Sequence, residues 1–242
     1  MEKTVSEAIT YRRSVRIYKD QEIDSSKVEG CIINGSLAPT SSNLQLWEFY
    51  HITSKEILDK LAIACFNQNA AKTAKQMVVF VSRQDLWRKR AKSNIDFLMK
   101  SFDKPHLDNR LLKRKKQVNK YYNKIIPLVY VDFFGILGFL KNLIFHLIGF
   151  FRPVYRQTRA SDLRIIAHKS TALAAENFMI SMAAIGYDTC PMEGFDSKMV
   201  KKILGLPNAA EITMIVSCGI RDEAGVYGER FRVPFKEVYY RL

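Results

Sequence analysis

Three arginines lie within five residues near the start of the chain, in the run Arg12-Arg13-Ser14-Val15-Arg16. A guanidinium group is planar and donates two parallel hydrogen bonds to a phosphate or a carboxylate. The run therefore predicts an anion-binding site. A basic helix end that faces solvent is the alternative, and the run alone does not decide between them.

A second group of cations lies near the other end of the chain, in the run Gly228-Glu229-Arg230-Phe231-Arg232-Val233-Pro234. Alternate residues of an extended segment point to the same side. Arg230 and Arg232 are therefore expected to reach one anion together. Cations from both ends of a chain rarely meet on one ligand by chance, so such a meeting would be strong evidence for an anion-binding site.

Two further stretches carry donors and glycine instead of clustered cations. The first is rich in small donors and turn formers, which also suit an ordinary loop before a strand: Pro39-Thr40-Ser41-Ser42-Asn43-Leu44-Gln45-Leu46-Trp47. The second is predicted to join a strand to a helix, in the run Pro191-Met192-Glu193-Gly194-Phe195-Asp196. Gly194 would let the backbone approach a flat ring closely.

In this order along the chain, the four motifs resemble those of the FMN-dependent nitroreductase family. The resemblance covers roughly residues 1–82 and 161–242. It implies a single α+β domain over residues 1–242, with three layers in which helices flank a central, mostly antiparallel sheet. It also implies an intertwined homodimer.

The resemblance further implies that FMN is held by residues of all four motifs and by Gln68. The loop that contains Ser41–Gln45 would come from the partner subunit, and Leu46 stands where the family usually has proline. The backbone N–H groups of Glu193 and Gly194 would face the flavin N5. The implied cofactor-binding residues are Arg12, Arg13, Ser14, Arg16, Ser41, Ser42, Asn43, Gln45, Gln68, Pro191, Met192, Glu193, Gly194, Arg230 and Arg232.

The implied activity is a ping-pong reaction in which NADH or NADPH reduces the flavin and an electron-poor acceptor then reoxidises it. Nitroaromatic compounds and quinones are such acceptors. On this interpretation no side chain acts as a catalytic acid or base, and no metal is needed. The alternative is a flavoprotein at a membrane surface whose central segment binds lipid or a partner, without classical nitroreductase turnover.

Hydrophobic periodicity predicts the elements that position these motifs. Helices are expected near residues 5–9, 25–37, 54–64, 162–185 and 197–204. Strands are expected over 47–53, 77–81 and 212–217, and strand-like residues 238–240 could join another sheet. Helices and strands do not alternate as in a strict βαβ pattern, so these elements indicate an α+β fold.

The middle of the chain, residues 85–160, does not fit the resemblance and is interpreted as an insert that covers the active site or contacts a membrane. The net charge of the protein is +14. The segment 83–124 holds fourteen Lys and Arg against four Asp, which makes +10 of that total. Such a block is either a solvated helical face or a surface for an anionic partner.

Residues 128–151 are the most apolar part of the insert and approach the length of a transmembrane helix. Asp132, Lys141 and His146 would be costly within a membrane. The preferred interpretation is a buried or active-site-covering helix pair, with peripheral membrane contact or a true span as alternatives. The basic block carries no nucleic-acid-binding motif. The chain starts with no secretory signal, so a cytoplasmic location is expected, with membrane association as the alternative.

Overall fold

The computed structural model describes residues 2–103, 106, 108–131 and 136–242. The expectations that concern Asp132, Phe133, Phe134 and Gly135 lie outside the described residues.

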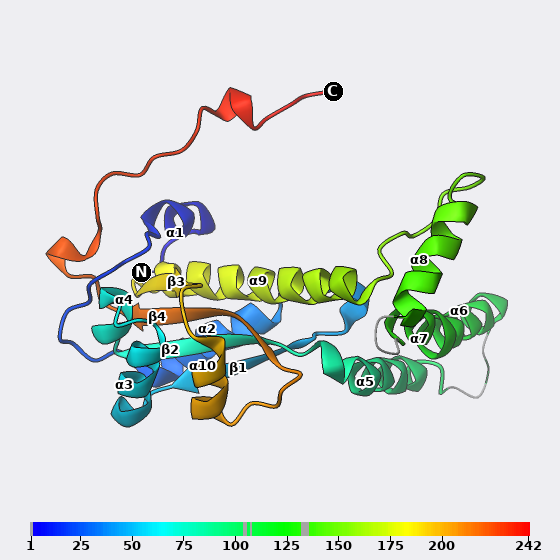
Figure 1. Cartoon of the computed structure of the whole chain (residues 1–242), viewed down its shortest axis with the longest axis horizontal. Coiled ribbons are helices and arrows are strands. Elements are labelled where there is room, and N and C mark those ends of the chain that lie inside the picture. The colour runs from blue at the N-terminus through cyan, green and yellow to red at the C-terminus, as the bar shows by residue number, and fades with distance from the viewer. Residues whose placement is uncertain (1, 104–105, 107, 132–135) are drawn as a thin grey trace.

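A four-stranded antiparallel sheet forms the centre of the molecule (Figure 1). Its strands, in spatial order, are β1 (Trp47–Ile52), β2 (Gln76–Ser82), β4 (Glu211–Gly219) and β3 (Asp188–Met192). Every residue of β2 is buried, because the strand is central and both faces of the sheet are covered. The strands predicted from the sequence over 47–53, 77–81 and 212–217 are confirmed.

Helices cover both faces of this sheet and make three layers. On one face, α3 (Lys55–Ala64), α4 (Asn69–Lys72) and α10 (Ser197–Leu204) pack against Met77 and Val79. On the other face, α2 (Ser25–Ser36) and α9 (Ala160–Ala184) pack against Val78 and Phe80. Successive residues of β2 thus enter different cores, as the two-residue period of a strand requires.

The long helix α9 is the main element of the second helical layer. Its Phe178 is fully buried, with its ring centroid 5.5 Å from that of Phe80. Helix α2 crosses α9 so closely that a Cβ at Gly35 would lie 3.0 Å from the carbonyl oxygen of Ala174. The short helix α1 (Val5–Tyr11) also contacts α9. Small residues on α9 are therefore explained by contacts within one chain.

Aspartate caps and a glycine set the helix boundaries. The Asp24 carboxylate accepts a hydrogen bond from the N–H of Ser26, and that of Asp196 accepts from Lys198 and Met199. Helix α10 ends at Gly205, which has a φ of 62°. The second helix was expected near residues 25–37. Helix α2 ends at Ser36, and the Leu37 side chain is 75% exposed.

The insert forms a separate group of helices around the N-terminal end of α9 (Figure 1). They are α5 (Trp87–Lys100), α6 (Asn109–Lys120), a π-helical turn (Tyr121–Ile125), α7 (Ile126–Tyr130) and α8 (Ile136–Ile148). A small core that includes Tyr122, Ile126 and Tyr130 packs against Leu163 and Ala167 of α9. The insert is thus fastened to the body through its own apolar contacts.

Two apolar segments are exposed in the single chain. The apolar face of α8 was expected to be buried, yet Leu140, Leu143 and Leu147 are each about half exposed. Residues 238–240 form no strand within this chain; they follow a short 3-10 turn (Phe235–Glu237) in an exposed tail, and their pairing with another sheet stays a prediction. Among the described residues, no helix combines the length and apolarity needed to cross a membrane.

Candidate cofactor site

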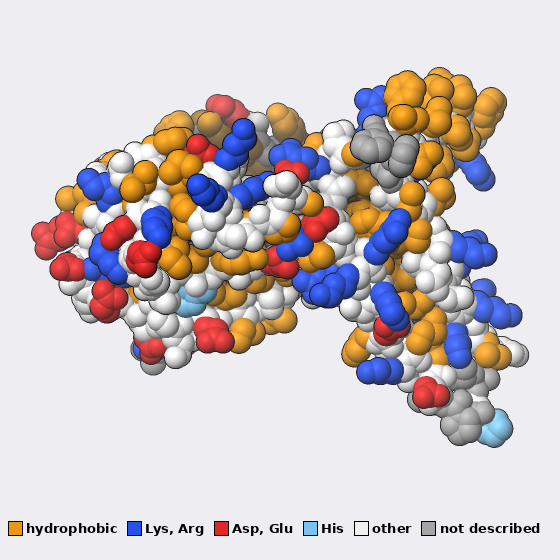
Figure 2. Space-filling view, turned by 60° about the horizontal axis from the view of Figure 1, so that its bottom comes forward, with side chains coloured by type: hydrophobic (Ala, Val, Ile, Leu, Met, Phe, Trp, Pro, Cys, Tyr) orange, Lys and Arg blue, Asp and Glu red, His pale blue; other side chains and the backbone are white. Residues whose placement is uncertain are grey.

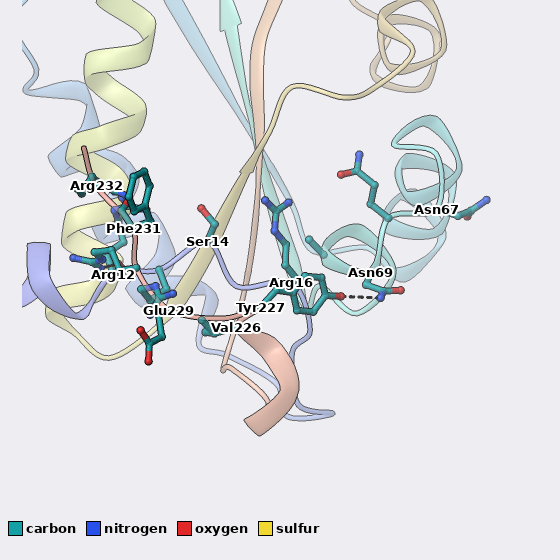
Figure 3. Close-up of a pocket in the computed structure, with 14 residues that line it drawn as sticks. Arg12, Ser14, Arg16, Asn67, Asn69, Val226, Tyr227, Glu229, Phe231 and Arg232 are labelled. Atoms are coloured by element: carbon teal, nitrogen blue, oxygen red, sulfur yellow. Dashed lines mark hydrogen bonds between the residues drawn. The ribbon is translucent and has the colours of Figure 1, made fainter. Parts of the chain in front are cut away.

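A cavity of about 610 Å³ opens where the segment after α1 meets the segment after β4 (Figure 3). Its walls come from the segment after α1, the segment before and within α4, and the segment after β4. The lining residues are Arg12, Arg13, Ser14, Arg16, Asn67, Gln68, Asn69, Ala70, Val226, Tyr227, Glu229, Arg230, Phe231 and Arg232. Both cationic motifs singled out in the sequence therefore line one cavity.

The N-terminal motif is positioned by the free edge of β3. The backbone N–H of Val15 donates to the carbonyl of Thr189 at 3.1 Å, and the Val15 side chain is fully buried. Because the segment is extended here, Ser14 and Arg16 project away from that core. The N–H of Arg16 donates to the carbonyl of Gly225 at 2.6 Å, which joins this segment to the C-terminal one.

Two arginine side chains form hydrogen bonds between residues 10–13 and residues 228–230. The Nη2 group of Arg13 donates to the carbonyl of Gly228 at 2.8 Å. The Nη2 group of Arg230 donates to the carbonyl of Thr10 at 2.9 Å and also to that of Arg12. These bonds hold the guanidinium groups near one another while leaving further N–H donors on each.

The cavity carries an excess of positive charge. Burial and the neighbouring Arg13, Arg232 and Arg12 guanidinium groups lower the pKa of Arg230. The nearest carboxylate to Arg12 belongs to Glu176, whose Oε1 lies 3.8 Å from Nε. Clustered cations that repel one another favour a bound anion, because the anion relieves the repulsion and accepts the remaining donors.

Gln68 connects the cavity to the Pro191–Asp196 motif. Its Nε2 donates to the carbonyl of Gly194 at 2.7 Å and to that of Cys65 at 3.0 Å. A Cβ at Gly194 would lie 3.3 Å from the same nitrogen, so this close approach suits glycine. Pro191, Met192, Glu193 and Gly194 do not themselves line the cavity. The motif does lie at the predicted junction of β3 and α10.

Several lining residues were not anticipated from the sequence. Asn67 and Asn69 flank Gln68, and the Asn69 side chain donates to the Tyr227 hydroxyl at 3.0 Å (Figure 3). Phe66 and Asn67 adopt φ angles of 57° and 53°, a left-handed conformation that is uncommon without glycine. The run Asn67-Gln68-Asn69, three amides before a short helix, was the available signal.

The Ser41–Gln45 loop does not join the cavity within one chain. It packs instead on the insert, where the Ser42 hydroxyl lies 2.7 Å from that of Tyr121. The Asn43 amide donates to Asn94 at 2.7 Å. The assignment of Ser41, Ser42, Asn43 and Gln45 to a site shared with a partner subunit therefore stays a prediction.

The insert does not cover the cavity of its own chain either, since none of its described residues lines it. Helix α9 has 25 residues, or about 37 Å at its usual rise, and the insert lies at its N-terminal end (Figure 1). The cavity lies towards the opposite end, beside α4. Coverage of a flavin by residues 85–160 would thus require the insert of a second subunit.

His168 and the four cysteines take structural places. His168 lies 2.9 Å from the Thr213 hydroxyl and 3.0 Å from a carboxylate oxygen of Glu211, as expected for a hydrogen-bonded histidine. All four cysteines are buried, and burial raises the pKa of Cys190 although Arg16 and Arg12 oppose it. Within the described ranges, no three His, Cys, Asp or Glu residues are grouped to hold a metal ion.

The sequence model of the nitroreductase family matches residues 9–220. The chain belongs to this family. It is 25% identical over 98% of its length to a Staphylococcus haemolyticus protein provisionally named an NAD(P)H nitroreductase, of which 97% is covered. The family prediction made from the four motifs is confirmed.

Solved structures show the same fold. A Bacillus subtilis protein provisionally described as a nitroreductase superposes with a TM-score of 0.73 at 20% identity, with 98% of each chain covered. A nitroreductase-type protein from Exiguobacterium sibiricum, solved in complex with FMN, gives a TM-score of 0.70 at 21% identity. That alignment covers 99% of this chain and 98% of the other. The predicted three-layer α+β fold is confirmed.

Proposed function

We propose that the protein is an FMN-dependent NAD(P)H oxidoreductase that reduces electron-poor organic acceptors such as nitroaromatics and quinones. The observation that carries this proposal is the single cavity lined by Arg12, Arg13, Arg16, Arg230 and Arg232. The names of the relatives, and the FMN complex of one structural neighbour, support the cofactor and the reductant.

The residues present fit FMN in charge and in polarity. A phosphate dianion needs several cationic donors, and the cavity offers five guanidinium groups. The ribityl chain needs polar partners, which Ser14, Gln68 and Asn69 offer. When bound, FMN supplies the hydride-accepting centre that none of the twenty side chains provides.

The roles of the protein's own residues are then to bind, orient and stabilise. Arg12, Arg230 and Arg232 balance phosphate charge, while Arg16 and Ser14 project from the edge of β3 towards the polar parts of the cofactor. Gln68 holds the Gly194 carbonyl in place, so that the backbone at Glu193 and Gly194 is presented in a fixed orientation. Fixed donors stabilise developing negative charge without reorganisation.

The test is the spectrum and kinetics of the purified full-length chain. We expect a yellow protein with a flavin absorption band that NADPH or NADH bleaches without oxygen. Menadione or nitrofurazone serves as acceptor, and the reciprocal rate is plotted against the reciprocal concentration of NADPH or NADH at several acceptor concentrations. The lines should be parallel, because in a ping-pong reaction the nucleotide leaves the site before the acceptor binds there. A protein that stays colourless and catalyses no pyridine-nucleotide oxidation after incubation with excess FMN would refute the proposal.

We further infer that the working form is a homodimer with shared sites. The Ser41–Gln45 loop lies outside the cavity of its own chain, and the C-terminal tail exposes Phe231, Phe235 and Tyr240. A patch of this kind is usually covered in the assembled protein. Light scattering at micromolar concentration should give the mass of two chains. A monomer that keeps flavin bound would contradict shared sites.

A further inference from the structure

Helix α8 has its polar and apolar sides reversed relative to an ordinary surface helix. Its buried residues are Gly138 and Asn142. Seven of its apolar residues are instead exposed, at 38% to 59%. They are Ile136, Leu137, Phe139, Leu140, Leu143, Ile144 and Leu147. A soluble helix normally turns its apolar side to the core and its polar side to water.

The polar side chains of α8 fasten it to the rest of the insert. The Asn142 amide donates to the carbonyl of Arg156 at 2.9 Å. The Lys141 ammonium donates to the carbonyl of Leu128 at 2.9 Å and also to that of Val131, near the end of α7. The reversal is therefore built from specific bonds, and the outward apolar face is what the helix presents to its surroundings.

The apolar face continues past the end of the helix onto a projecting tip. Phe150 and Phe151 are 81% and 90% exposed. Figure 2 shows hydrophobic side chains gathered on one knob that stands off the body, with Lys and Arg around and beneath it. An exposed contiguous apolar surface of this kind marks a contact with a partner or a membrane.

Positive charge accompanies the apolar face. Arg152 follows Phe151 directly and is exposed. Helix α6 of the same insert exposes six further cations, Arg110, Lys113, Arg114, Lys115, Lys116 and Lys120, and holds no acidic residue. An apolar helix face with adjacent cations is the combination that an anionic bilayer surface binds, through acyl-chain burial and attraction to headgroups.

We propose that α8 and the Phe150–Arg152 tip form a peripheral docking surface for anionic phospholipid bilayers. The apolar face would lie at the boundary between headgroups and acyl chains, with the helix parallel to the surface. The cations of Arg152 and α6 would face the headgroups. This surface is separate from the guanidinium-lined cavity, so its binding does not depend on whether the cavity holds a flavin.

The experiment is flotation of the full-length protein with vesicles. We expect binding to phosphatidylcholine vesicles that contain about 30% phosphatidylglycerol, and little binding to phosphatidylcholine alone, because each cation contributes about fivefold to the affinity for a charged surface. Raising the salt to about 0.5 M should weaken binding by shortening the screening length. Failure of the wild type to float with anionic vesicles would overturn the proposal.

Matched variants locate the surface. Leu143→Ser/Leu147→Ser removes two half-exposed side chains from α8 and should weaken vesicle binding by about tenfold or more. The control Ile33→Ser/Ile63→Ser removes two side chains of similar exposure from α2 and α3 and should leave binding unchanged. Equal binding by both variants and the wild type would overturn the proposal.

A second copy of the chain is the competing occupant, and light scattering detects it. We expect Leu143→Ser/Leu147→Ser to keep the mass of the wild type. If that variant changes the mass while the wild type ignores vesicles, the face is an interface between copies and the proposal fails. Circular dichroism of both variants checks that they are folded.

Discussion

The sheet body and helix α8 place apolar side chains in opposite environments. In the body, all of β2 is buried and Phe80 packs on Phe178. In α8 the buried positions are Gly138 and Asn142, while the leucines face outward. Both segments are highly apolar in sequence. The difference teaches that apolar composition alone does not say whether a segment is buried by its own chain.

The largest expected effect is on the stability of the two regions. Phe178→Ala removes a fully buried ring and should lower the free energy of unfolding by about 3–5 kcal/mol. Leu140→Ala in α8 should change it by less than about 0.5 kcal/mol, because that side chain is already half exposed. Urea titration followed by circular dichroism measures both. If Leu140→Ala lowers the free energy of unfolding by nearly as much as Phe178→Ala does, Leu140 is buried and the contrast between the two regions is wrong.

A smaller effect on stability is expected when a hydrogen bond that attaches α8 to the rest of the insert is removed. Asn142→Ala removes a buried amide and its hydrogen bond to the Arg156 carbonyl, which keeps its bond from the N–H of Thr158, so we expect a cost of about 0.5–1.5 kcal/mol. Because no apolar residue of α8 other than glycine is fully buried among the described residues, this cost should appear as local opening of the helix. Amide hydrogen exchange should speed up over 136–148 while the exchange of β2 stays unchanged. Unaltered protection of α8 would show that other contacts hold the helix.

The smallest effect concerns acid stability of the body. Burial raises the pKa of Glu211, but hydrogen bonds from His168 and Arg164 outweigh it and lower that pKa below its ordinary value. A lowered carboxyl pKa stabilises the fold above the unfolded-state pKa, and this stability is lost as the pH falls through the folded-state value. Glu211→Gln should therefore flatten the decline of Tm below about pH 5. An unchanged pH profile would contradict this coupling.

Much of the body could be predicted because its local signals agree with its packing. The β2 run is apolar throughout, Asp24 and Asp196 stand at helix starts, and Gly205 stands at a helix end. The cationic motifs were also found from the sequence, because three arginines within five residues and an alternating pair near the other end are local patterns. Their meeting in one cavity depends on the β3 edge and on crossing hydrogen bonds, which no local pattern reveals.

The rest could not be predicted because it depends on contacts outside one chain or far apart in it. Asn67 and Tyr227 both line the cavity although they are 160 residues apart in the sequence. A hydrogen bond from Asn69 to the Tyr227 hydroxyl joins the two segments. The exposure of α8 depends on which of its sides the chain turns inward. The hydrophobic spacing predicted the helix but left its orientation open. The tail after Pro234 lacks a strand because no edge of this sheet pairs with it.

The central claim is that guanidinium groups from both ends of the chain hold one phosphate-bearing cofactor. The direct measurement is an FMN titration of Arg12→Ala/Arg232→Ala beside the control Lys198→Ala/Lys202→Ala, which removes two exposed cations from α10. Loss of two charge-assisted contacts should raise the Kd for FMN by at least about 100-fold, at roughly 1.5–3 kcal/mol each, and the control should bind as the wild type does. If the arginine variant is folded and keeps the wild-type Kd, the cavity does not bind the phosphate and the account is contradicted.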